Sequence, residues 1–116
     1  MPGYRLFLVA LLTLLFLPAC SSSASPPTCS DPQTTTTVQL QDFSFGPNCF
    51  QASAGATLTL PNTGDAAHTF TVKGTGVDVK VDSGATGQAS LDGIAPGTYT
   101  VVCTFHPEMV ATMRVG

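Results

Sequence analysis

The chain has 116 residues and a formal net charge of −3, a length that fits one small domain. Charged residues make up only 9% of the sequence, whereas 11 glycines and 9 prolines favour short strands joined by turns. The sequence contains no tryptophan, no basic cluster and no run of like charge, so it lacks the electrostatic footprint of a nucleic-acid-binding protein.

Residues 1–19 have the features of a signal peptide. Arg5 precedes an apolar run from Leu6 to Leu17 that only Thr13 interrupts. The run is too short for a membrane-spanning helix, which needs roughly 20 residues, so we interpret it as an export signal.

Cys20 follows Leu17, Pro18 and Ala19 in an order that resembles the lipobox of bacterial lipoproteins. The resemblance implies acylation of Cys20, cleavage ahead of it, and attachment to the periplasmic or outer face of the cytoplasmic membrane. Pro18 departs from the small residue that is usual at its position. The alternative is an ordinary signal peptide cut near Ala19 or Ala24, which would leave a soluble protein.

Residues 20–37 are rich in serine, proline and threonine and contain almost no large apolar side chain. Such a segment cannot bury enough surface to offset the entropy lost on ordering it, so we predict a flexible tether. The tether precedes a predicted folded domain of residues 38–116.

Within residues 38–116, apolar and polar residues alternate with a period of two, which is typical of strands with one buried face. The expected strands are separated by glycine, proline and aspartate turns and cover residues 38–41, 50–53, 57–60, 68–73, 77–82, 89–91, 99–103 and 110–115. About eight short strands without helical periodicity predict an all-β fold, a β-sandwich or barrel of Greek-key type.

The segment Tyr99–Met109 brings three potential metal ligands close together in the sequence. They are the thiolate of Cys103, the imidazole of His106 and the thioether of Met109. These soft and borderline donors suit copper better than calcium, magnesium or manganese. A trigonal copper site needs a second imidazole beside the thiolate, and the other histidine of the chain is His68.

The strand pattern predicts where these ligands lie. His68 opens one strand and Cys103 ends another, and both point inward on the apolar faces of their strands. We expect His106 and Met109 on a loop before the last strand, because Pro107 prevents that strand from simply continuing. The hypothesis is a mononuclear copper site built from these four ligands. A lone histidine at a strand start is more often a packed or surface residue, but here both histidines fall where one site uses them.

The four cysteines are accounted for by the same hypothesis. Export places the chain in an oxidising compartment, where exposed unpaired thiols are unlikely to persist. With Cys20 assigned to lipid and Cys103 to metal, Cys29 and Cys49 form the predicted disulfide. The alternative is a disulfide that includes Cys103, since four cysteines allow three connectivities.

The segment from Gly97 to Met109 resembles the C-terminal signature of the cupredoxins, the plastocyanin, pseudoazurin and amicyanin group of blue copper proteins. Two residues separate Cys103 from His106, and two separate His106 from Met109, a spacing most similar to the compact loop of amicyanin. The resemblance covers residues 38–116. It implies a cupredoxin-like Greek-key fold, with His68 as the first histidine ligand, Cys103 as the thiolate, His106 as the second histidine and Met109 as the axial sulfur.

The resemblance also implies a function. We expect an exported, lipid-anchored monomer that shuttles single electrons through one copper ion cycling between Cu(I) and Cu(II), and not an enzyme. Redox partners are expected to dock on an apolar surface around His106, formed by Phe105, Pro107, Met109 and Pro47. Thr69 stands where relatives often have asparagine, which implies weaker bracing of the cysteine loop.

Three alternatives remain open from the sequence. A copper-holding or copper-delivery protein would use the same fold and ligands. An enzyme, such as one domain of a multicopper oxidase or nitrite reductase, would need ligands for a further copper, and both histidines are already used. A metal-free adhesive or structural sandwich would tolerate loss of Cys103 or His68. Met113 is a second thioether, but its place within the last strand indicates packing.

Overall fold

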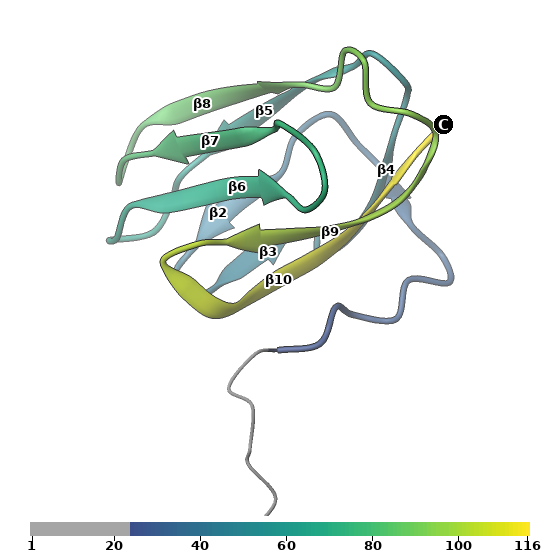
Figure 1. The fold of residues 1–116 in the computed structure, drawn as a ribbon. Helices are drawn as coiled ribbons and strands as arrows, with labels where there is room; N and C mark the ends of the chain where they lie inside the picture. The colour runs from purple at the N-terminus through teal and green to yellow at the C-terminus, as the bar shows by residue number, and fades with distance from the viewer. Residues whose placement is uncertain (1–23) are drawn as a thin grey trace, which may run out of the picture.

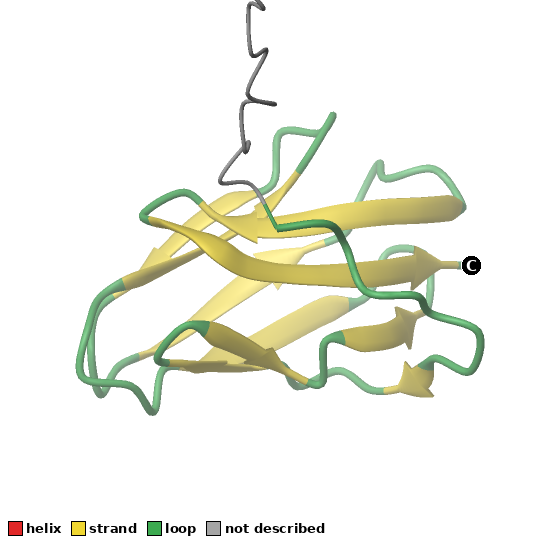
Figure 2. Ribbon diagram, turned by 90° about the horizontal axis from the view of Figure 1, so that it is seen from below, coloured by secondary structure: helices red, strands yellow, loops and turns green. Residues whose placement is uncertain are grey.

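The computed structural model describes residues 24–116, so the predicted signal peptide and Cys20 lie outside the described residues. Every regular element in this range is a strand (Figures 1 and 2). None of the described residues belongs to a helix long and apolar enough to cross a membrane. The strands are β1 (Gln33–Thr34), β2 (Gln39–Gln41), β3 (Ser44–Gly46), β4 (Cys49–Ala52), β5 (Thr57–Pro61), β6 (His68–Val72), β7 (Asp78–Val81), β8 (Thr86–Ser90), β9 (Gly97–Cys103) and β10 (His106–Val115).

The strands form two layers. One layer is a six-stranded sheet in the order β1-β4-β10-β9-β6-β7, and the other contains the pairs β2–β3 and β5–β8 (Figure 1). Strand β4 pairs in parallel with β1 and β10, whereas β10, β9, β6 and β7 are antiparallel neighbours. Because β4 and β10 pair although they are far apart in the chain, the connections cross between layers. The predicted all-β Greek-key sandwich is confirmed.

Period-two alternation locates the core between the two layers. Each inner strand turns alternate apolar side chains towards the opposite layer, where they are removed from water. Phe70 on β6, for example, packs edge-on against Phe45 on β3, with ring centroids 6.0 Å apart. The buried hydrophobic residues are Val38, Leu40, Phe45, Phe50, Ala52, Leu58, Leu60, Phe70, Val72, Val81, Ala89, Leu91, Val101, Cys103, Met109, Ala111, Met113 and Val115.

The eight predicted strands are present as β2 and β4 to β10, with ends that differ by a few residues. The sequence pattern did not predict β1 and β3. Strand β1 has two residues, both exposed, and β3 buries only Phe45. Neither strand has two buried apolar residues spaced two apart, whereas the segment predicted for β2 has buried Val38 and Leu40.

Part of the segment predicted as a tether lies in the sheet. Gln33 and Thr34 pair with β4, and the backbone N–H of Thr35 donates to the carbonyl of Gln51 at 3.1 Å. The Cys29–Cys49 disulfide joins the same segment to the start of β4. The ordered fold therefore begins before residue 38, because backbone hydrogen bonds and a covalent link supply contacts that the side chains of this segment do not.

Removal of the disulfide tests how strongly it stabilises the fold. The bond closes a loop with a sequence separation of 20 residues. In the chain-entropy model, a disulfide that closes a loop of this size destabilises the unfolded state relative to the native state by about 3 kcal/mol. We expect the double variant Cys29→Ala, Cys49→Ala to lose about this much free energy of unfolding. Urea denaturation of the metal-free protein measures it, and an unchanged midpoint would contradict the expectation.

Candidate metal centre

Three strand ends bring the predicted ligands to one edge of the six-stranded sheet. His68 is the first residue of β6, Cys103 the last of β9 and His106 the first of β10. Since β9 runs antiparallel to both β6 and β10, the end of β9 meets the starts of the other two strands. The start of β6, the end of β9 and the start of β10 lie at the left-hand end of the sheet in Figure 1.

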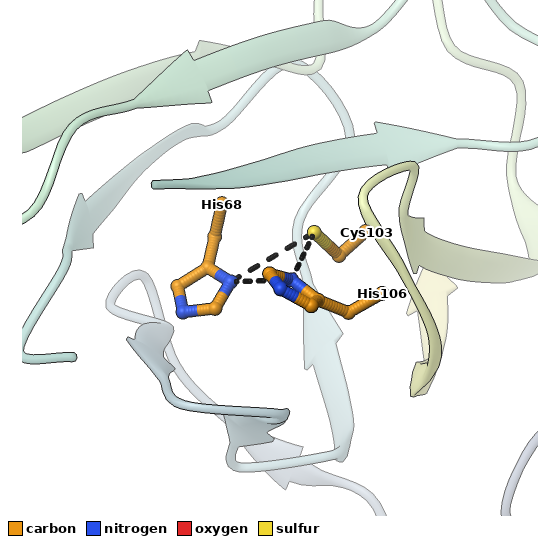
Figure 3. Close-up of side chains that lie close together, drawn as sticks. All are labelled: His68, Cys103 and His106. Carbon is orange, nitrogen blue, oxygen red and sulfur yellow. Dashed lines mark hydrogen bonds between the residues drawn. The ribbon is translucent and has the colours of Figure 1, made fainter. Parts of the chain in front are cut away.

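The three donor atoms form a compact triangle (Figure 3). Cys103 Sγ lies 3.8 Å from His68 Nδ1 and 3.6 Å from His106 Nδ1, and the two Nδ1 atoms are 3.2 Å apart. His68 and Cys103 are buried, whereas His106 is half-buried. The convergence of one sulfur and two ring nitrogens, predicted from the strand ends, is present in the structure.

The triangle has the size that one metal ion requires. Bonds of about 2.0 Å to nitrogen and about 2.3 Å to sulfur in a trigonal plane separate two nitrogens by about 3.5 Å and a nitrogen from a sulfur by about 3.7 Å. The three observed edges lie close to these values. One thiolate with two imidazoles is also the donor set of trigonal copper sites, so the residues present fit copper.

Met109 and Pro107 belong to a bulge at the start of β10. His106 pairs with Cys103 and Val110 with Val102, so three residues of β10 lie opposite no residue of β9. Of these three, Pro107 and Glu108 are exposed, while Met109 is fully buried and thus faces the interior. The predicted loop before the last strand is therefore wrong in detail: strand β10 already begins at His106. A bulge accommodates Pro107 because its residues need not donate to the ladder.

Thr69 connects the cysteine end of β9 to β6. Its backbone N–H donates to Cys103 Sγ at 3.3 Å, and its hydroxyl oxygen accepts the backbone N–H of Thr104 at 2.9 Å. The hydroxyl also lies 3.0 Å from that of Thr71. The expectation of weaker bracing was based on the absence of an asparagine amide. The structure shows instead that the hydroxyl itself braces the residue after Cys103.

Asp42, which the sequence analysis did not single out, contacts the first histidine. Its Oδ1 atom lies 3.0 Å from His68 Nε2, on the side of the ring away from the triangle. The hydrogen bond from the backbone N–H of Asp65 is the main cause of a lowered pKa at Asp42, and hydrogen bonds from Ala66 and His68 lower it further. This carboxyl group is therefore ionised at neutral pH. No local pattern marked it, because its partner is 26 residues away.

Two exposed aromatic residues lie at the same end. Phe43 and Phe105 are 52% and 51% exposed, and they are the large hydrophobic side chains that the described residues leave exposed. The ring of Phe43 packs edge-on against His106, with centroids 4.9 Å apart. Phe105 directly precedes His106 in the turn after Cys103. Phe105 was predicted at this surface, whereas Phe43 was not. Met109 was also predicted there, but it is 0% exposed and so does not contribute to the surface.

The fold and the donor set define a small β-sandwich protein with a copper-type site. The family model described as a cupredoxin-like domain matches residues 7–115, and the chain belongs to this family. The sequence is 30% identical over 117 residues to methylamine utilization protein MauL of Methylophilus methylotrophus, a match that covers 95% of this chain and 67% of MauL. The predicted resemblance to cupredoxins is confirmed.

Solved structures share the fold. The copper-containing nitrite reductase of Thermus scotoductus is 22% identical with a TM-score of 0.60 over 79% of this chain. The chain spans 25% of that enzyme's length. A reduced Cu(I) form of an amicyanin mutant is 21% identical with a TM-score of 0.57, covering 69% of this chain and 80% of amicyanin. Membership of the cupredoxin-like family agrees with the prediction that the chain itself is not an enzyme.

A substitution at Thr69 tests the bracing of the cysteine end. Valine keeps the shape but removes the acceptor of the Thr104 N–H, so we expect Thr69→Val to lower the free energy of unfolding by about 1 kcal/mol. The Thr104 amide should also exchange faster with solvent. Denaturant unfolding and amide hydrogen exchange measure the two effects. Thr69→Ser retains the hydroxyl and serves as the control, and equal exchange rates in the valine and serine variants would contradict the role.

Proposed function

We propose that this protein carries single electrons by means of one copper ion at the His68, Cys103, His106 triangle. The observation that carries the proposal is the convergence of two Nδ1 atoms and one Sγ atom within 4.8 Å of one another. Copper bound there supplies reversible chemistry between Cu(I) and Cu(II). The copper named for both structural relatives supports the choice of metal.

The residues of the site contribute to metal binding in different ways. Thiolate and thioether favour Cu(I), imidazole accepts either oxidation state, and a fixed arrangement suits both. We infer that Met109 would also hold the ion through its thioether, because it is buried within the bulge that starts at His106. The hydrogen bond from the Thr69 N–H stabilises negative charge on Cys103 Sγ and limits movement of the sulfur. Little rearrangement then accompanies a change of oxidation state.

The location of the protein is part of the proposal. We infer that residues 1–19 direct export and that Cys20 carries the lipid, so that the carrier is held at the periplasmic or outer face of the cytoplasmic membrane. Residues between the lipid and the Cys29–Cys49 disulfide serve as the tether, and the copper domain follows. A carrier of this kind works as a monomer and exchanges electrons with redox proteins that reach the same compartment.

The partner surface surrounds the accessible histidine. Phe43 packs against the half-buried ring of His106, and exposed Phe105 is the residue before it, so an apolar partner surface can approach that ring closely. Exposed Glu108 adds negative charge beside it, and the chain as a whole is acidic. We therefore propose partners with an apolar contact area and a basic rim.

Copper loading tests the proposed function. One equivalent of Cu(II) should give an intense blue absorption band and reversible one-electron electrochemistry. Cys103→Ser should lose the band, because it removes the thiolate that lies in the triangle. Met113→Leu, a core substitution of similar volume, should keep it. Visible spectroscopy measures both, and circular dichroism checks folding. Colourless protein that binds and exchanges only Cu(I) would contradict the carrier and favour the copper-delivery alternative.

A surface substitution tests the partner surface without an identified partner. Two carriers that exchange electrons must bring their accessible histidines together, so Phe105→Ser should slow self-exchange between the Cu(I) and Cu(II) forms. We expect about a tenfold fall, equivalent to about 1.4 kcal/mol of encounter energy. Nuclear magnetic resonance line broadening in mixed samples measures the rate. Phe105→Leu, which stays apolar, is the control, and an equal rate in the serine and leucine variants would contradict the surface.

A further inference from the structure

The turn between β2 and β3 reaches the candidate site. Gln41 pairs with Ser44, so only Asp42 and Phe43 form the turn. Asp42 contacts His68, and Phe43 contacts His106. We propose that Asp42 is a positioning residue of the metal site: its carboxylate accepts the Nε2–H of His68 and so directs the unprotonated Nδ1 into the triangle. This proposal rests on the proposed function, because it concerns the same site.

The hydrogen bond determines which tautomer His68 adopts. An imidazole can ligate a metal only through a nitrogen without a proton, and a carboxylate can only accept a hydrogen bond. With Nε2 3.0 Å from the carboxylate, the ring proton belongs on Nε2 and the lone pair on Nδ1. His68 is 0% exposed, so solvent does not provide another partner for that N–H. Without Asp42, a buried donor would lack an acceptor.

The carboxylate is itself held in place. Its Oδ2 accepts the backbone N–H of Asp65 at 2.9 Å, and its Oδ1 accepts that of Ala66 at 3.2 Å. The side chain of Asn62 fixes this loop, because it donates to the carbonyls of Ala66 and Val81 and accepts the N–H of Gly64. Asp42 therefore links the first hairpin to the loop that leads into His68.

Gly64 leaves the space that Asp42 occupies. A Cβ atom at Gly64 would lie 2.9 Å from both the Cγ and the backbone N of Asp42, and closer still to Oδ1. Real Cβ contacts do not reach such distances, so any other residue would displace the carboxylate. The backbone of Gly64 is not in the left-handed region. The close approach of Asp42, rather than the backbone conformation, therefore requires glycine here.

The turn also retains an unfavourable backbone conformation. Phe43 has a φ of 68°, and it is the one non-glycine residue with a positive φ in the described range. Glycine or asparagine is normally preferred at such a turn position, because a larger side chain there costs energy. Strained residues persist mainly where surrounding contacts hold them, often at functional sites. Here each of the two turn residues contacts one of the two imidazoles, which is consistent with a role in positioning them.

The test uses the tautomer and the copper affinity together. Asparagine has one side-chain oxygen in place of the two carboxylate oxygens. In Asp42→Asn the side-chain NH2 would therefore face either the N–H of Asp65 or the N–H groups of Ala66 and His68. We expect the Nε2–H tautomer of His68 to lose its dominance and Cu(II) affinity to fall 10-fold to 100-fold, the usual range for loss of an outer-shell partner. The reduction potential should rise, because a negative charge that favours Cu(II) is removed. Imidazole nitrogen chemical shifts, competition titration and voltammetry measure these changes.

Two further variants separate positioning from charge and from folding. Gly64→Ala keeps the charge of Asp42 but displaces its carboxylate, so it should also lower affinity and disturb the tautomer. Asp65→Asn removes an exposed charge nearby while its backbone N–H remains, and it should leave the tautomer unchanged. Thermal unfolding of the metal-free proteins shows which variants are folded.

The outcomes distinguish this proposal from the proposed function. The tautomer of His68 is read in metal-free protein, so it remains measurable if wild-type protein gives no blue band, a result that would overturn only the carrier function. An unchanged tautomer in Asp42→Asn would overturn the positioning role. So would a copper affinity in Asp42→Asn equal to that in Asp65→Asn.

Discussion

The antiparallel pairing of β9 with both β6 and β10 is the constraint on which the site depends. Each pairing has a fixed register, with Thr71 opposite Val102 and Val110 opposite Val102 on the other side. The pairing therefore places the end of β9 beside the starts of β6 and β10 at one edge of the sheet. A shift of one residue would turn Cys103 to the opposite face and separate its sulfur from both histidines. The same alternation that buries the core thus sets the position of the donor atoms.

Contacts outside the triangle hold the donors before any metal binds. The Thr69 N–H fixes the sulfur, the Thr69 hydroxyl fixes the next backbone unit, and the Asp42 carboxylate fixes the far nitrogen of His68. These groups belong to the sheet or to loops that are themselves hydrogen-bonded. Ligands with few alternative positions lose little entropy on binding and move little when the charge of the ion changes. A rigid donor set is what one-electron exchange requires of a protein.

The sequence predicted those features that depend on local pattern. Alternation identified eight of the ten described strands, and the spacing of Cys103, His106 and Met109 identified the ligand segment. The contact of Asp42 was missed because Asp42 lies 26 residues before His68. Thr69, 35 residues before Thr104, was connected to the cysteine end only through the family resemblance. The start of β10 was misplaced because Pro107 argues against a regular strand, whereas a bulge leaves room for it.

The two histidines differ in exposure, so the site is more open to a partner on the His106 side than on the His68 side. His68 is fully buried, with its outer nitrogen engaged by Asp42, so no partner can reach its ring. His106 is half-buried, its ring contacts that of exposed Phe43, and exposed Phe105 precedes it in the chain. Cys103 is 2% exposed, which protects its sulfur from solvent oxidants. Of the three donor residues in the described part of the chain, His106 is therefore the one that leaves part of its ring open to a partner, while the sulfur of Cys103 is buried.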